Sequence, residues 1–144
     1  MIQAIFGLLG VLVGGAVTFG VEMTLQERRT KELTRQAARL VAFDLRVAGR
    51  IVRLAVEQDE LWLDQDRPGV PSWGECRAVL AESLDGEGWQ TVTTAVMLVS
   101  LAATDYERVS PLTERDRSSL GKAAKAADKG CARLDDLTGD KPVR

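Results

Sequence analysis

The sequence contains no histidine among its 144 residues. Ser-His-Asp triads, Cys-His nucleophile systems and histidine-based metal sites all need that side chain, so these classes are excluded. The remaining candidate bases include Tyr106, but the spacing of the acidic residues brings no two carboxylates together. The sequence therefore predicts no catalytic residue, no cofactor and no metal site, and hence a protein that is not an enzyme.

Cysteine is almost as scarce. Cys76 and Cys131 lie far apart, fit no CxxC spacing and are too few for a disulfide framework. We expect both to be reduced thiols.

An overall excess of basic charge is also missing, because the net charge is −2 with 28% charged residues. No nucleic-acid partner is therefore expected. The charges are unevenly spread: residues 28–53 carry eight basic and two acidic side chains, whereas residues 54–106 carry two basic and ten acidic ones. Basic residues near a bilayer attract anionic headgroups, which makes membrane lipid an expected partner. The acidic region is either a partner surface or a solubilising one.

Residues 2–21 carry no charge at all, and eleven of them are Leu, Ile, Val or Phe. A helix of this length spans about 30 Å, the thickness of the hydrocarbon core of a bilayer. The segment lacks the basic start and the small-residue cleavage site of a signal peptide. We therefore predict a single-pass membrane protein with a transmembrane helix at residues 1–21.

The basic residues that follow this segment set its expected orientation. They are Arg28, Arg29, Lys31, Arg35 and Arg39. Because positive charge is retained on the inner side, we predict a cell-membrane location with the N-terminus outside and the C-terminal domain in the cytoplasm.

Small residues gather on one face of the predicted span. They are Gly7, Gly10, Gly14 and Thr18. Such a face lets two membrane helices approach closely, which predicts a homo-oligomer. The competing interpretation is that glycine is simply common in membrane helices.

Proline is rare too, with four residues of which the first is Pro68. The hydrophobic periodicity and the positions of proline and glycine predict an all-α fold. The transmembrane helix is expected to continue into a long amphipathic helix. This helix packs in a small bundle of three or four helices at 22–138. The expected segments are a long helix at 22–63, a loop at 64–74, helices at 75–84, 89–108 and 113–137, and a frayed tail at 139–144. Thr113 and Asp116 are expected to form a capping box at the start of the last helix.

Apolar residues in the long helix recur every seven positions, as in a coiled coil. The column is Leu33, Leu40, Val47, Leu54 and Leu61, flanked by Val41, Ala48, Ala55 and Trp62 and by Ala37 and Ile51. We expect this wide face to pack in the bundle, with Asp44 and Gln58 hydrogen-bonded on it.

The later helices show apolar faces of the same kind. They are Trp89, Val92, Val96, Val99, Ala103 and Tyr106 in the third helix, and Leu120, Ala123, Ala127, Cys131 and Leu134 in the last.

One loop partly matches a calcium-binding pattern, with Asp64, Asp66, Gly69 and Glu75 at the spacing of four loop positions. Pro68, however, stands where a carboxylate or amide ligand belongs. We therefore interpret the loop as an acidic surface segment.

A set of aromatic and apolar positions spread over about a third of the domain carries a resemblance. The positions are Trp62, Asp66-x-Pro68, Trp73, Arg77, Leu80, Leu84 and Trp89. With the Gly-rich N-terminal helix and the Arg-rich junction, the chain resembles a group of small, uncharacterised single-span membrane proteins of high-GC bacteria. That group has no assigned activity, so the resemblance implies the architecture and no chemistry.

Two functions from different classes fit these features. The first is a non-enzymatic, membrane-anchored helical module for protein–protein interaction or scaffolding, with a protein partner of unknown identity. The alternative is a phage-borne or toxin-like oligomer that perturbs membranes.

Overall fold

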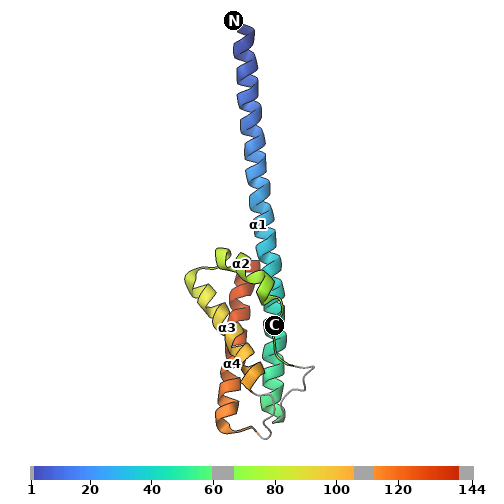
Figure 1. The fold of residues 1–144 in the computed structure, drawn as a ribbon, viewed down its shortest axis with the longest axis vertical. Helices are drawn as coiled ribbons and strands as arrows, with labels where there is room; N and C mark the ends of the chain where they lie inside the picture. Colours follow the sequence, from blue (N-terminus) through green and yellow to red (C-terminus); the bar gives the residue numbers. More distant parts are fainter. Residues whose placement is uncertain (1, 60–66, 106–111, 140–144) are drawn as a thin grey trace. The chain divides into compact units, whose positions relative to one another are not determined.

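The computed structural model describes the backbone of residues 2–59, 67–105 and 112–139, and the side chains of residues 22–59, 67–104 and 112–139. Over these residues the chain is all-helical and contains no strand, which confirms the predicted fold class (Figure 1). The helices are α1 (Ile2–Gln58), α2 (Trp73–Ser83), α3 (Gly86–Asp105) and α4 (Glu114–Thr138). The helices predicted at 1–21 and 22–63 are thus one element, α1, which ends several residues earlier than expected. Of the tail predicted at 139–144, Gly139 forms the C-cap of α4, and residues 140–144 lie outside the described residues.

The chain divides into two compact units, Met1–Leu33 and Thr34–Arg144, and α1 runs from one into the other. In the first unit, every side chain described, from residue 22 to residue 33, is exposed. The predicted span and its face of Gly7, Gly10, Gly14 and Thr18 lie outside the residues whose side chains are described. Among the residues whose side chains are described, no helix is both long and apolar enough to cross a bilayer.

The second unit has a core of mostly small side chains, to which all four helices contribute. In Figure 1, α3 and α4 lie alongside the C-terminal part of α1, and the short α2 runs crosswise to them. The predicted apolar face of α4 is confirmed, because all five of its residues are buried. On α3, Val92, Val96 and Val99 are buried as predicted, whereas Tyr106 lies outside the described residues.

Two glycines let the helices come close to one another. A Cβ atom at Gly130 of α4 would lie 2.9 Å from the Cβ of Ala95 on α3 and 3.1 Å from the Cδ1 of Leu45 on α1. A Cβ atom at Gly49 of α1 would lie 3.1 Å from the Cβ of Ala127 on α4. Interior glycine costs a helix about 1 kcal/mol relative to alanine, and here the close packing offsets that cost.

The burial of α1 corrects one prediction. The column expected at the centre of the packed face is exposed, as seen at Leu33, Leu40, Val47 and Leu54, while Leu61 and Trp62 lie outside the described residues. The buried column is Ala38, Leu45 and Val52, together with the predicted flank of Val41, Ala48 and Ala55. The alanine-rich face is the one that packs because small side chains permit the close approach to α4.

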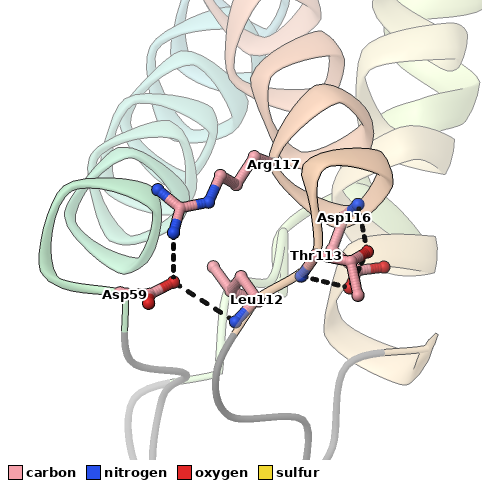
Figure 2. A network of polar contacts seen from close by, with 5 residues as sticks. All are labelled: Asp59, Leu112, Thr113, Asp116 and Arg117. Carbon is pink, nitrogen blue, oxygen red and sulfur yellow. Dashed lines mark hydrogen bonds and ion pairs between the residues drawn. The ribbon is translucent and has the colours of Figure 1, made fainter.

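Asp59 terminates α1 and connects its end to the start of α4 (Figure 2). This residue adopts a left-handed backbone conformation with φ of 57°, which aspartate tolerates better than most residues. Its Oδ1 accepts hydrogen bonds from the Arg117 guanidinium at 2.9 Å and from the Leu112 backbone N–H at 3.2 Å. Beside this network, Thr113 and Asp116 form the predicted capping box of α4.

A second carboxylate, Asp44, fixes the start of α2. Its Oδ2 accepts hydrogen bonds from the backbone N–H of Ser72 at 2.9 Å and from the Ser72 hydroxyl at 2.6 Å. The prediction that Asp44 is hydrogen-bonded on the packed side is therefore confirmed. The same prediction for Gln58 is wrong, because this side chain is exposed one residue before α1 ends at Asp59.

The contact at Gly130 predicts a loss of stability on enlargement. Gly130→Ala would place its methyl group against Ala95 and Leu45, and we expect a loss of about 1–3 kcal/mol in the free energy of unfolding despite the gain in helix propensity. The matched control is Gly121→Ala on the same helix, where a Cβ meets no atom within 4 Å. That variant should gain up to about 1 kcal/mol. Urea unfolding of the full chain in neutral detergent, followed by tryptophan fluorescence, measures both, and equal shifts in the two variants would contradict the close contact.

The Asp59 network predicts a graded response. Asp59→Ala removes both accepted hydrogen bonds and puts alanine in a left-handed conformation, so we expect a loss of about 1–2 kcal/mol. Asp59→Asn retains an acceptor oxygen and tolerates the backbone, and it should lose less. The same unfolding assay measures these effects, with exposed Glu57→Ala as the control. An alanine variant as stable as the wild type would show that the network contributes nothing.

Candidate interaction surface on α1

Four large apolar side chains of α1 form a stripe on the outside of the second unit. Leu40 is 55% exposed, Phe43 63%, Val47 43% and Leu54 39%. At 100° per residue these positions fall within about 60° of one another around the helix. Single exposed apolar residues are ordinary, whereas several on one face of a helix are typical of a surface that contacts another apolar surface.

One side of this stripe is bordered by arginines. On the helical wheel Arg39, Arg46, Arg50 and Arg53 all follow the stripe on the same flank. The opposite flank carries half-buried Ile51 and Asp44. The stripe is therefore amphipathic across its width, apolar at the centre and cationic along one edge.

Part of the arginine border forms ion pairs with α4. Arg46 pairs with Asp135, and Arg53 pairs with Asp128 at 2.9 Å. These residues line a surface groove of about 500 Å³ between α1 and α4. Arg50 lies between the two pairs and has no ion-pair partner among the described residues. The Arg53–Asp128 pair is exposed and contributes little to stability, whereas Asp135 in the other pair is largely buried, with 13% of its side chain exposed.

The residues that carry the resemblance have a structural role. Trp73 on α2 stacks on Trp89 on α3, with ring centroids 5.4 Å apart, and both are half-buried. Leu80 is fully buried beside them in the same core, whereas Arg77 is exposed. Trp62 and Asp66 lie outside the described residues.

The acidic loop offers no site in the described part of the chain. Asp64 and Asp66 lie outside that part, Pro68 is buried, and Glu75 is exposed in the first turn of α2. Over the described residues, no group of three or more Cys, Asp or Glu side chains is placed to hold a metal ion.

Both thiols are free and buried, which confirms the prediction of reduced cysteines. Burial raises the pKa of the Cys131 thiol to about 11, and its Sγ donates a hydrogen bond to the Ala42 carbonyl oxygen at 3.4 Å. Burial also raises the pKa of Cys76, with a further contribution from the neighbouring Glu75 carboxylate. The raised pKa values make both thiols weaker nucleophiles at neutral pH than an exposed cysteine.

Comparison of the chain with protein-family models found no match, and comparisons with curated proteins and with solved structures found none either. The arrangement of side chains is therefore the basis for a functional proposal.

The stripe was missed as a surface in the sequence, although a signal for it was present. Two apolar columns with the same seven-residue repeat lie on nearly opposite sides of α1, about 160° apart, one through Leu45 and one through Val47. A helix that is apolar over so wide an arc has more apolar surface than a single packed face needs.

The buried thiols predict slow and pH-dependent modification. In Cys76→Ala, which leaves Cys131 alone, the thiolate fraction at neutral pH should be on the order of a hundredfold below that of an unperturbed cysteine. The rate of reaction with a disulfide reagent should therefore be low in the folded protein and rise steadily with pH toward about 11. The same variant in denaturant is the control. Equal rates in the folded and denatured states would contradict the burial of Cys131.

Proposed function

We propose that the protein is a non-enzymatic, membrane-anchored helical module that binds a partner protein through the stripe of Leu40, Phe43, Val47 and Leu54. The exposure of this stripe on the folded unit is the observation that carries the proposal. Its i, i+3, i+7 spacing is the spacing with which one helix presents anchors to another.

The arginine border favours a partner with acidic residues along one edge. A helix that covers the stripe places its own edge against the arginine flank, on which Arg50 has no ion-pair partner among the described residues. Acidic residues on that edge would be favoured electrostatically, whereas basic ones would be repelled. The partner is therefore an amphipathic helix with an apolar centre and an acidic edge, supplied by another protein.

The anchor in this proposal is the uncharged segment at 2–21, with the N-terminus outside and the second unit in the cytoplasm. Its support is the apolar length of the segment and the basic residues that follow it. Self-association through Gly7, Gly10, Gly14 and Thr18 would bring several binding units together at one place on the membrane, as a scaffold requires.

Site-specific photo-crosslinking in native membranes tests the proposal. A photoreactive residue at Phe43 should give a discrete adduct heavier than the chain, and the chain should stay in the membrane pellet after an alkaline wash. The matched control is the same residue at Ala81, exposed on α2 away from the stripe. Adducts of equal yield at both positions, or none at Phe43, would contradict the proposed surface.

Charge reversal makes the test specific. Arg50→Glu should reduce the yield of the Phe43 adduct several-fold, because Arg50 borders the stripe and its exposed side chain is not needed for folding. Arg115→Glu, which changes an exposed arginine on α4, should leave the yield unchanged. An adduct of twice the mass of the chain would assign the stripe to a second copy and overturn the assignment to a different protein.

A further inference from the structure

The two long edges of α4 carry opposite charges and meet different neighbours. Asp128 and Asp135 point toward α1 and pair with its arginines. The other edge carries a row of basic side chains, which are Lys122, Lys125, Lys129 and Arg133, with one acidic residue, Asp136, beside Arg133 at its end. At 100° per residue this basic row falls within about 80° around the helix.

The basic row meets almost no acidic charge on α3. Arg133 pairs with Asp85 just before α3, and the hydrogen bond from its guanidinium holds the pKa of that carboxyl below its ordinary value. The only acidic side chain of α3 beside the lysines is Glu87, and none of the three lysines forms an ion pair within the described residues. Three positive charges thus lie in a row opposite one negative charge.

These lysines line a groove between α3 and α4 with a volume of about 450 Å³. Its other lining residues are Glu87, Gln90, Thr91 and Thr94 from α3 and Ala126 from α4. The lysine row from Lys122 to Lys129 extends for about 10 Å along the helix, which is long enough to contact more than one anionic group.

Thr94 adds a second, independent indication. Thr91, Thr93 and Thr104, the other threonines of α3, each donate their hydroxyl hydrogen to the backbone carbonyl four residues earlier. Thr94 makes no such bond in the described structure, although it occupies the same kind of helical position. Its hydroxyl is therefore available to donate into the groove opposite the lysines.

We propose that this α3/α4 groove binds a small anionic ligand that carries two or more phosphate groups, held by Lys122, Lys125 and Lys129 and by the Thr94 hydroxyl. Lysine ammonium groups bind phosphate oxygens as point charges, and a neighbouring hydroxyl adds a directional hydrogen bond. Several phosphates match the row better than one, because a single group reaches only part of its length. This site does not depend on the α1 stripe or on its partner.

The test is a titration of the full chain in neutral detergent with inorganic tripolyphosphate, followed by amide NMR shifts. The shifts should centre on residues 87–94 and 122–129. The triple variant Lys122→Gln, Lys125→Gln and Lys129→Gln should bind about tenfold more weakly or worse, because each charge-assisted contact is lost. Thr94→Val should weaken binding by about threefold, and Thr104→Val, on the same helix, should leave it unchanged.

A second triple variant distinguishes binding in the groove from general electrostatic attraction of the anion to the protein. The triple variant Lys31→Gln, Arg35→Gln and Arg77→Gln removes the same charge from three exposed positions outside α3 and α4 and should bind like the wild type. Equal weakening in both triple variants, undiminished binding in the lysine variant, or shifts centred elsewhere would each overturn the proposal. Circular dichroism of each variant verifies that the helices are intact.

A second arm identifies the source of the phosphate groups. The titration is repeated in nanodiscs of neutral lipid and in nanodiscs that contain a phospholipid with a polyphosphorylated headgroup. Loss of tripolyphosphate binding in the latter supports the site and assigns it to a lipid headgroup. Unchanged binding supports the site and assigns it to a soluble phosphorylated compound.

Discussion

The close approach of α4 to α1 and α3 is the constraint on which the rest of the domain depends. It places glycine or alanine at the closest contacts between the helices, as at Gly130 against Ala95 and at Gly49 against Ala127. Small side chains bury little apolar area each, so they stabilise the fold only when the backbones come near enough for dense dispersion contacts. Larger side chains such as Phe43 do not fit into such a seam, and α1 presents them on its outer side. The packing and the exposed stripe therefore have a common cause.

The packing of α4 also decides which helix each of its charged edges faces. Its acidic edge faces the arginines of α1, and Asp128 and Asp135 on this edge form ion pairs with two of them. Its basic edge borders α3, a helix with few charges, and only Arg133 at one end finds an acidic partner there. Because α4 uses only one of its charged edges in the fold, the other edge retains its attraction for an anion. The α1 stripe and the α4 groove are thus two separate surfaces of one small unit.

Much of the fold was predictable from the sequence because it depends on local or periodic signals. The capping box at Thr113 and the apolar face of α4 needed only neighbouring residues and a period of 3.6. The choice between the two apolar columns of α1 was not predictable, since periodicity identifies an apolar face and not how closely a neighbouring helix can approach it. The partner of Asp44, the Ser72 at the start of α2, could not be read either. The α3/α4 groove depends on which faces of two helices meet, and that is decided by the packing at Gly130.

The network at Asp59 has a consequence for the topology of the unit. A hydrogen bond of 3.2 Å joins the Asp59 carboxylate to the Leu112 backbone N–H, so the chain leaves α1 and returns to α4 at nearly the same point. In topological terms, residues 60–111 are an insertion between two antiparallel helices whose ends are already held together. Loop-closure entropy changes only slowly with length. The contact at Asp59, and not the length of the chain between the two helices, therefore holds the end of α1 against the start of α4.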